Sequence, residues 1–169
     1  LNKKFKKLNK VIDKYIFDEI IPKYYSNIIK LQERTPKMRV ILNKGWLNIS
    51  QSENWNNIHT HNSSWISGVF YIRIPSEMTR GQIRFIDPVQ TRANCEHTMV
   101  QPTGIEKPIN LMPTSGMLVL FPSWLEHDVM EFNYNEEKDK IGDRISYSFD
   151  YNIDGLVWDE EWENVYESN

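Results

Sequence analysis

A succession of short β-rich segments separated by turns constrains the fold of this chain most. After Pro36 the sequence runs through stretches rich in valine, isoleucine and aromatic residues, with turn signals such as PTSG and KIGD between them. Many short strands with few helices are typical of a β-sandwich or a β-barrel. We therefore predict a mainly β fold with strands at residues 38–44, 45–51, 54–61, 64–74, 81–88, 116–122, 126–132 and 144–153.

The two ends of the chain differ from this β-rich centre. Residues 5–33 carry apolar side chains at helical spacing, and Pro22 predicts a break or a new helix start within them, because proline cannot donate a helical hydrogen bond. We predict a helical region over 1–35 that packs on one sheet, followed by the barrel at about 38–155. The tail, 156–169, is acidic with spaced aromatic residues and suggests no function.

Length and composition exclude several classes of protein. The 169 residues contain no repeat or linker, so we predict a single domain over 1–169. A net charge of −3 disfavours a nucleic-acid partner. The single cysteine, Cys95, excludes an internal disulfide and suggests a cytoplasmic location. No apolar run predicts a membrane span, and the basic start lacks the apolar segment of a secretory signal. The oligomeric state stays open.

Two of the four histidines lie two residues apart, just before an apolar strand. Residues two apart on a strand point to the same face, so His59 and His61 would project together. Two converging imidazoles are what a metal ion requires from one strand, although two unrelated polar residues at a strand end give the same pattern. A third histidine, His127, follows the strongly apolar strand at 116–122. Alone it reads as a core or surface residue, but beside the first pair it is a candidate third ligand.

A possible anion site lies further along the chain. Arg144, Ser146 and Ser148 share one face of the predicted strand at 144–153. A guanidinium binds a carboxylate through two parallel hydrogen bonds, and a hydroxyl supplies another. The alternative is an edge-strand arginine paired with a surface acid.

The order of these features resembles the iron(II)- and 2-oxoglutarate-dependent dioxygenases. The segments HTHNSSWISGVFYI, IRFIDP, LVLFPSWLEHDV and RISYSFDYN resemble, more narrowly, a small family of 2OG-Fe(II) oxygenases over about residues 40–155. The resemblance implies a double-stranded β-helix, that is, a jelly-roll or cupin-like barrel. It also implies Fe(II) as cofactor, 2-oxoglutarate and molecular oxygen as cosubstrates, and a hydroxylase that converts 2-oxoglutarate to succinate.

The resemblance also implies roles for individual residues. His59 and His127 would bind iron, whereas His61 stands where most members of the superfamily carry Asp or Glu. Three arrangements are open: His61 binds the metal, Asp87 from another strand completes the site, or only two protein ligands bind with an extra water. The spacing of His59 and His61 favours the first.

The same resemblance assigns the cosubstrate site. Arg144 would bind the distal carboxylate of 2-oxoglutarate, with Ser146 and Tyr71 sharing that role. His127 and Arg144 lie further apart than in most members, which a longer hairpin loop would explain. No catalytic residue beyond the metal site is implied.

Other residues and other functions compete with this interpretation. We expect Trp46, Trp55 and Trp65 to pack in the core rather than to wall the site, and the segment 88–113 to be a loop that covers the site. His97, close to Cys95, lacks the second cysteine that a thiol site would need. Two other functions compete: a cupin-like three-His metal dioxygenase without 2-oxoglutarate, and a non-catalytic barrel that acts as a binding module. The substrate, a small molecule or a protein side chain, stays open.

Overall fold

The structure is a computed structural model, and it describes the N-terminal helical segment and most of the β-rich region. The described ranges are 3–23, 37–86 and 109–157, and for 37–39 and 154–157 only the backbone is described. The chain divides into two compact units, one formed by residues 1–43 and 151–169 and the other by residues 44–150. Whether residues 1–169 form a single domain stays a prediction.

The first unit begins with one amphipathic helix. Helix α1 spans Lys3–Tyr15 and passes directly into a π-helical turn, η1, at Ile16–Ile20. The helix continues to residue 23, so the predicted break at Pro22 is wrong. The irregularity lies one turn earlier instead, at the π turn, since Pro22 cannot donate the backbone hydrogen bond that an α-helix would form there.

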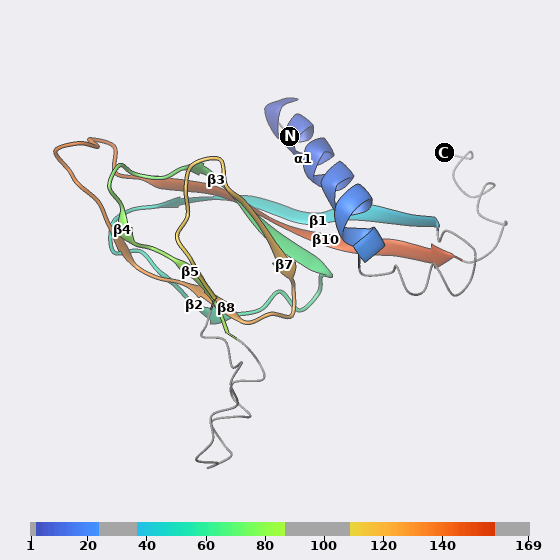
Figure 1. The fold of residues 1–169 in the computed structure, drawn as a ribbon. Helices are drawn as coiled ribbons and strands as arrows, with labels where there is room; N and C mark the ends of the chain where they lie inside the picture. Colours follow the sequence, from blue (N-terminus) through green and yellow to red (C-terminus); the bar gives the residue numbers. More distant parts are fainter. Residues whose placement is uncertain (1–2, 24–36, 87–108, 158–169) are drawn as a thin grey trace, which may run out of the picture. The chain divides into compact units, whose positions relative to one another are not determined.

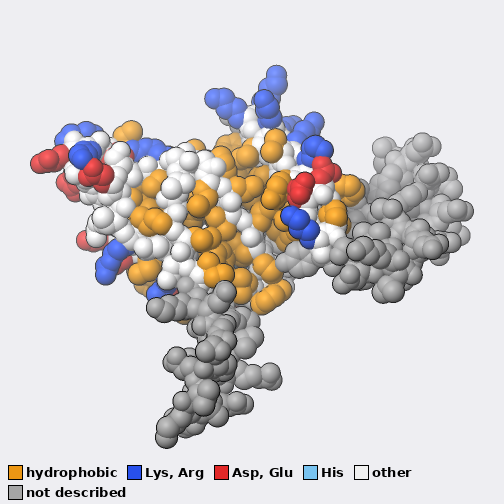
Figure 2. All heavy atoms as spheres, viewed as in Figure 1, with side chains coloured by type: hydrophobic (Ala, Val, Ile, Leu, Met, Phe, Trp, Pro, Cys, Tyr) orange, Lys and Arg blue, Asp and Glu red, His pale blue; other side chains and the backbone are white. Residues whose placement is uncertain are grey.

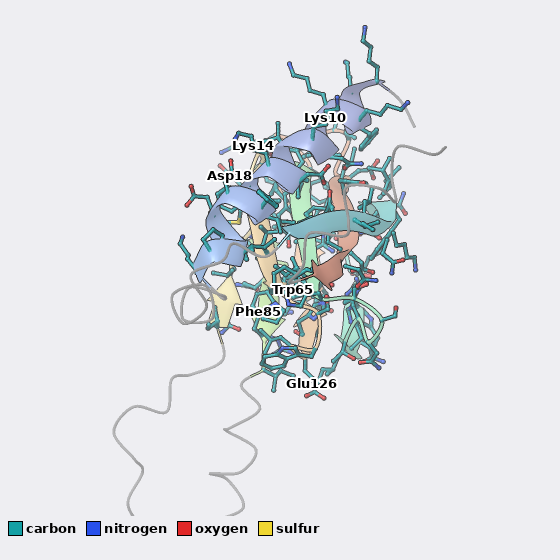
Figure 3. All side chains as sticks on the ribbon, turned by 90° about the vertical axis from the view of Figure 1, so that its right-hand side faces the viewer. Lys10, Lys14, Asp18, Trp65, Phe85 and Glu126 are labelled. Carbon is teal, nitrogen blue, oxygen red and sulfur yellow. The ribbon has the colours of Figure 1, made fainter. Side chains whose placement is uncertain are left out.

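The two faces of this helix are chemically distinct. Ile12 and Ile16 are almost completely buried, whereas Lys10, Lys14 and Asp18 follow one another along the exposed side at intervals of one turn (Figure 3). Lys14 forms an ion pair with Asp18. The lysines of α1 form the group of basic side chains at the top of Figure 2. Within the described ranges, no helix is long and apolar enough to cross a membrane.

The β-rich region is built from two main sheets, and the chain passes repeatedly from one to the other (Figure 1). One sheet has the order β1-β10-β3-β7 and the other β2-β8-β5-β6, and a small sheet pairs β4 with β9. Alternation between two facing sheets is the winding of a double-stranded β-helix, so the predicted mainly β jelly-roll fold is confirmed. The strands are β1 (Lys37–Ser50), β2 (Asn56–His59), β3 (Ile66–Arg73), β4 (Thr79–Arg80), β5 (Ile83–Phe85), β6 (Ile109–Leu111), β7 (Leu118–Pro122), β8 (His127–Val129), β9 (Phe132–Asn133) and β10 (Arg144–Val157).

Each predicted strand has a counterpart, but two details of the prediction are wrong. The strands expected at 38–44 and 45–51 form one continuous strand, because Gly45 lacks the side chain that would collide with Tyr147. Within the segment 88–113, which was expected to be a loop, β6 pairs with β5. Three residues carry too little periodicity to predict such a short edge strand.

Apolar side chains of both sheets fill one end of the space between them. Val69 and Tyr71 of β3 and Val119 and Phe121 of β7 meet Ile83 and Phe85 of β5 in one buried cluster. Strands β3 and β7 pair in antiparallel register, with Gly68 opposite Leu120. This cluster gives the second unit a rigid interior on one side of the cavity described below.

Gly68 tests how tightly this sheet is packed. A methyl group on Gly68 would lie 2.5 Å from the ring of Phe149 and 2.7 Å from Leu120. We predict that Gly68→Ala lowers the free energy of unfolding by about 1–3 kcal/mol, because overpacking forces neighbours off their preferred rotamers. Chemical denaturation measures the change, and an unaltered midpoint would show that Phe149 has room to move.

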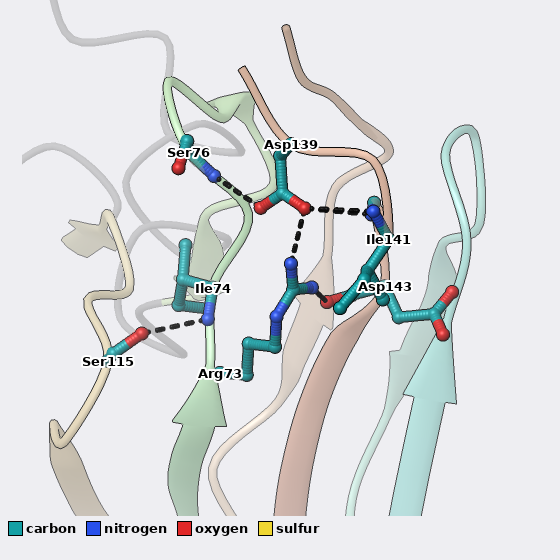
Figure 4. Close-up of polar contacts among 8 residues, drawn as sticks. Arg73, Ile74, Ser76, Ser115, Asp139, Ile141 and Asp143 are labelled. Atoms are coloured by element: carbon teal, nitrogen blue, oxygen red, sulfur yellow. Dashed lines mark hydrogen bonds and ion pairs between the residues drawn. The ribbon is translucent and has the colours of Figure 1, made fainter. Parts of the chain in front are cut away.

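A buried carboxylate holds together the loop that precedes β10. Asp139 accepts hydrogen bonds from Arg73 at the end of β3 and from the backbone N–H groups of Ser76, Ile141 and Gly142, the last three at 3.0–3.1 Å (Figure 4). Arg73 also donates to the Asp143 carbonyl. The bonds from the Ser76 and Gly142 backbone, with that from Arg73, hold the pKa of Asp139 well below its usual range. The longer hairpin expected between His127 and Arg144 is therefore an ordered, clamped loop.

We predict that Asp139→Asn lowers the melting temperature by several degrees at neutral pH. Because the folded-state pKa of Asp139 is depressed, its stabilisation is complete above the unfolded pKa of about 3.9 and is lost as the pH falls further. The difference in melting temperature between wild type and variant should therefore stay constant from pH 7 to about pH 4 and shrink below it.

Asp143→Asn is the matched control for this prediction. It removes the same charge from the same loop, but within the described residues the Asp143 carboxylate forms no ion pair and points away from the clamp (Figure 4). Thermal unfolding of both variants over a pH series provides the measurement. Equal losses in the two variants would contradict the clamp.

Candidate metal and anion site

Three histidines converge at one end of the second sheet. His59 ends β2 and His127 begins β8, and the two residues are register partners across that strand pair. His61 follows β2, with its ring centroid 5.2 Å from each of the other two. One ring nitrogen from each residue lies within 4.8 Å of the other two. The structure thus brings together the three residues that the sequence singled out as metal ligands.

His61 reaches this position by a different route from the predicted one. Strand β2 ends at His59, so strand alternation does not aim His61. Instead its backbone N–H donates to the carbonyl of Ser123 at 2.8 Å, which draws the chain after β2 toward the end of β7. The histidine pair converges because of this tertiary contact.

The orientation of the three rings suits a metal ion. In each ring Nδ1 faces an oxygen that can only accept, so Nδ1 is the hydrogen-bond donor and Nε2 is the nitrogen left to face a metal. Outer hydrogen bonds of this kind are typical of metal-binding histidines. The acceptors are the carbonyl of Asn57 for His59 at 2.6 Å, the carbonyl of Leu125 for His127 at 2.9 Å, and the carboxylate of Asp150 for His61 at 2.9 Å.

The surroundings of His127 keep its ring neutral. The side chain is 3% exposed and packs edge-on against Phe121, with ring centroids 4.6 Å apart. Burial lowers the pKa of His127 to about 4, although its bond to Leu125 acts in the opposite direction. At neutral pH the ring is therefore uncharged and its lone pair is available to a metal.

Asp150 is a site residue that the sequence analysis missed. It is 6% exposed and accepts a hydrogen bond from Ser67 at 2.7 Å in addition to that from His61. Burial alone would raise the pKa of Asp150, but the bonds from His61 and Ser67 outweigh it, so the pKa is lowered. The sequence did offer a way to find it: Asp150 lies an even number of residues after Arg144 along β10, so strand alternation places both side chains on the same face.

Arg144 is a buried cation. Its side chain is 4% exposed, lies over the ring of Phe132 with 4.7 Å between guanidinium carbon and ring centroid, and donates a long bond of 3.4 Å to the carbonyl of Gly81. No carboxylate in the described ranges forms an ion pair with it. The alternative of an edge-strand arginine paired with a surface acid therefore does not hold within these ranges. A buried guanidinium without an acid is a ready site for an anion.

Tyr71 and Ser146 line the same cavity as Arg144. Burial raises the pKa of Tyr71 to about 12, although the charge of Arg144 acts in the opposite direction. The phenol therefore keeps its proton and can donate a hydrogen bond. A cation and two hydroxyl groups face one space, as the sequence predicted.

This cavity also contains the three histidines, so a metal and an anion bound there would be neighbours. Its apolar side includes Val69, Ile83, Phe121 and Val129. Its polar side includes Asn48 and Ser148, joined by a hydrogen bond of 2.8 Å.

The tryptophans are placed differently from the prediction. Trp46 lines the cavity and stacks on His61 with ring centroids 5.8 Å apart, which is the walling role considered as its alternative. Trp55 is 59% exposed and is not a core residue. Trp65 is half-buried.

Several residues considered as functional lie outside the described ranges. Asp87, the alternative carboxylate ligand, is one of them, and so are His97 and Cys95. The acidic tail lies almost entirely beyond the described residues as well. The structure therefore leaves the role of Asp87 as an untested alternative.

Comparison with known proteins agrees with this chemistry. The sequence profile of a family described as "Putative 2OG-Fe(II) oxygenase" matches residues 44–150, which include all three histidines and Arg144. None of the curated proteins matches the sequence.

Several solved structures align with this chain at low sequence identity. An oxidoreductase of the 2OG-Fe(II) oxygenase family from Burkholderia pseudomallei aligns with a TM-score of 0.49 and 11% identity over 85% of this chain and 57% of its own. A Pseudomonas putida prolyl-4-hydroxylase aligns with a TM-score of 0.44 and 14% identity, over 78% of this chain and 61% of its own. HygX from Streptomyces hygroscopicus with nickel and 2-oxoglutarate bound aligns with a TM-score of 0.43 and 14% identity, over 81% of this chain and 66% of its own. The chain thus spans only about three fifths of the first two proteins.

We predict that the three histidines bind one divalent metal ion together. Replacing His127 by alanine should lower the affinity for Co(II) by at least about 100-fold, because the loss of one of three ligands leaves a chelate of two. Titration of the protein with Co(II), followed by its visible absorption, measures the affinity. His59→Ala and His61→Ala should show similar losses.

His97→Ala is the control, since it removes the one remaining histidine of the chain. Its Co(II) affinity should equal that of wild type. A loss with His97→Ala as large as with His127→Ala would show that Co(II) binds elsewhere.

Proposed function

Because the chain belongs to the family of 2OG-Fe(II) oxygenases, we propose that it is an iron(II)- and 2-oxoglutarate-dependent dioxygenase that hydroxylates a small molecule or a protein side chain. The observation that carries this proposal is the buried guanidinium of Arg144, which lies in the same cavity as the three histidines and has no acidic partner among the described residues. A metal site alone would suit many enzymes, whereas a metal site beside a buried cation supports a reaction with an anionic cosubstrate or substrate.

His59, His61 and His127 would hold the iron. Their free Nε2 lone pairs and the neutral state of His127 fit a divalent ion that accepts imidazole ligands. When bound, iron(II) with 2-oxoglutarate supplies the activation of dioxygen and the oxidation of a C–H bond, with release of succinate and carbon dioxide. Three protein ligands leave positions open for the cosubstrates.

Arg144 and Tyr71 would bind the carboxylate of 2-oxoglutarate that lies away from the metal. The guanidinium offers parallel donors that match a carboxylate, and the un-ionised phenol of Tyr71 adds a neutral donor. Ser146 contributes a further hydroxyl from the same face of β10. An anion bound there relieves the cost of burying Arg144, so the two charges stabilise each other.

The walls of the cavity suit an oxidation from which water must be excluded. Val69, Ile83, Phe121 and Val129 present apolar surface beside the histidines, and dry surroundings prevent side reactions. Asn48 and Ser148 add hydrogen-bonding groups on the other side, which would orient a polar part of the substrate. The proposal includes a cytoplasmic location and a substrate other than nucleic acid, and the net charge of −3 supports the second point.

A cupin-like three-His metal dioxygenase without 2-oxoglutarate is the second candidate. The described part of the chain brings three histidines together with no carboxylate among them, which favours this candidate. It leaves the burial of Arg144 beside Tyr71 without a purpose, since such an enzyme needs no second anion site.

We predict that purified protein binds Fe(II) and then 2-oxoglutarate without oxygen, with a visible metal-to-ligand charge-transfer band. Arg144→Gln should raise the 2-oxoglutarate concentration at half-saturation by about 10–100-fold, because a charge-assisted pair is worth about 1.5–3 kcal/mol. Admission of oxygen should then yield succinate.

Arg84→Gln is the matched control, because Arg84 is already paired with Asp128 and does not line the cavity. It should saturate at the wild-type 2-oxoglutarate concentration. Iron binding without a band or succinate would overturn the 2-oxoglutarate requirement and favour the second candidate. The absence of iron binding would leave a barrel that acts as a binding module.

A further inference from the structure

We propose that Asp150 acts as the charge-balancing and positioning residue of the metal site, through its hydrogen bond to Nδ1 of His61. The inference rests on the proposed function, since it concerns the same metal site, and it assigns a role to a residue that does not itself touch the metal. It explains how a site of three histidines, none of which supplies a negative charge, could hold a divalent ion.

The geometry of Asp150 is directed at the metal site. One carboxylate oxygen lies 2.9 Å from Nδ1 of His61, and it also accepts the hydroxyl of Ser67 at 2.7 Å. Because Nδ1–H of His61 donates a hydrogen bond to the carboxylate, the opposite nitrogen, Nε2, is the one left to bind a metal. A carboxylate in this outer position also makes the imidazole a stronger ligand.

The carboxylate itself is held in place by buried groups. Ser67 is 1% exposed and Ser123 is 0% exposed, and their hydroxyl oxygens lie 2.8 Å apart. Ser123 also accepts the backbone N–H of His61 through its carbonyl. Ser67 of β3 and Ser123, which follows β7, therefore hold both the backbone of His61 and the carboxylate that orients its ring.

One face of the His61 ring stacks on Trp46, with ring centroids 5.8 Å apart and an angle of 23° between the planes. His61 is thus held at its backbone, at Nδ1 and on one face. His59 and His127 receive only backbone carbonyls at Nδ1, so His61 is the one ligand among the three whose partner is charged. Asp150 would thus supply the negative charge that a carboxylate ligand normally supplies, but from behind the His61 ring rather than by direct contact with the metal.

The experiment compares the Co(II) affinity of four purified proteins: wild type, Asp150→Asn, Asp150→Ala and Asp128→Asn. Asparagine keeps a hydrogen-bond acceptor for His61 but removes the charge, whereas alanine removes both. We expect Asp150→Asn to bind Co(II) about 10–100-fold more weakly than wild type, and Asp150→Ala to bind more weakly still.

Asp128→Asn is the matched control. Asp128 is 7% exposed and adjoins a proposed ligand, His127, but its carboxylate pairs with Arg84 and not with a histidine ring. Asp128→Asn removes one negative charge near the site, as Asp150→Asn does. We expect its Co(II) affinity to stay close to that of wild type, and an equal loss in Asp128→Asn would overturn the specific role of Asp150.

A second measurement does not depend on the variants folding. In the wild-type protein loaded with Zn(II), nitrogen-15 NMR of the histidine rings should show the Nδ1 proton of His61 far downfield and protected from solvent exchange. A His61 ring that carries its proton on Nε2, or an exchanging Nδ1 proton, would overturn the proposal.

The outcomes separate this inference from the proposed function. If wild type binds Co(II) and Asp150→Asn binds it equally well, the role of Asp150 falls and the oxygenase proposal stands. If wild type itself fails to bind Co(II), both are overturned.

Discussion

The alternation of side chains along β10 is the constraint on which the site depends. Because successive residues of a strand point to opposite faces, Tyr147 and Phe149 are buried on one side, while Arg144, Ser146 and Ser148 line the cavity on the other. Asp150 continues this polar face to the histidines. One strand thus carries both the proposed anion-binding cation and the proposed balancing carboxylate, and its rigidity fixes the distance between them.

A polar strand face inside a barrel costs stability unless its groups find partners. Asp150 has His61 and Ser67, and Ser148 has Asn48. Within the described ranges, Arg144 has a long bond to a carbonyl and the face of an aromatic ring, and no acidic partner. The start of β10, where Arg144 lies, is therefore the least well compensated part of this face, and the loop before it is held by the bond between Asp139 and Arg73.

Sequence patterns predicted what depends on local periodicity and missed what depends on tertiary contact. Alternation from Arg144 placed Ser146 correctly in the cavity, and the same rule extends to Asp150, which was overlooked because the arginine-serine pattern ends earlier. His61 joined the site by its backbone bond to Ser123, a contact between distant segments that no periodicity reveals. The continuity of β1 through Gly45 depends likewise on Tyr147, a residue of another strand.

The charges of the proposed site sum to neutrality only when Asp150 is counted. A divalent metal and the guanidinium of Arg144 are cationic, and a 2-oxoglutarate dianion cancels all but one unit of that charge. The carboxylate of Asp150 cancels the last unit, without occupying a coordination position. A buried site with an uncompensated charge would bind metal and cosubstrate more weakly, since burial penalises net charge. In the proposed site, the three histidines and Asp150 therefore form one unit: His61 would contact the metal, and Asp150 would supply the negative charge.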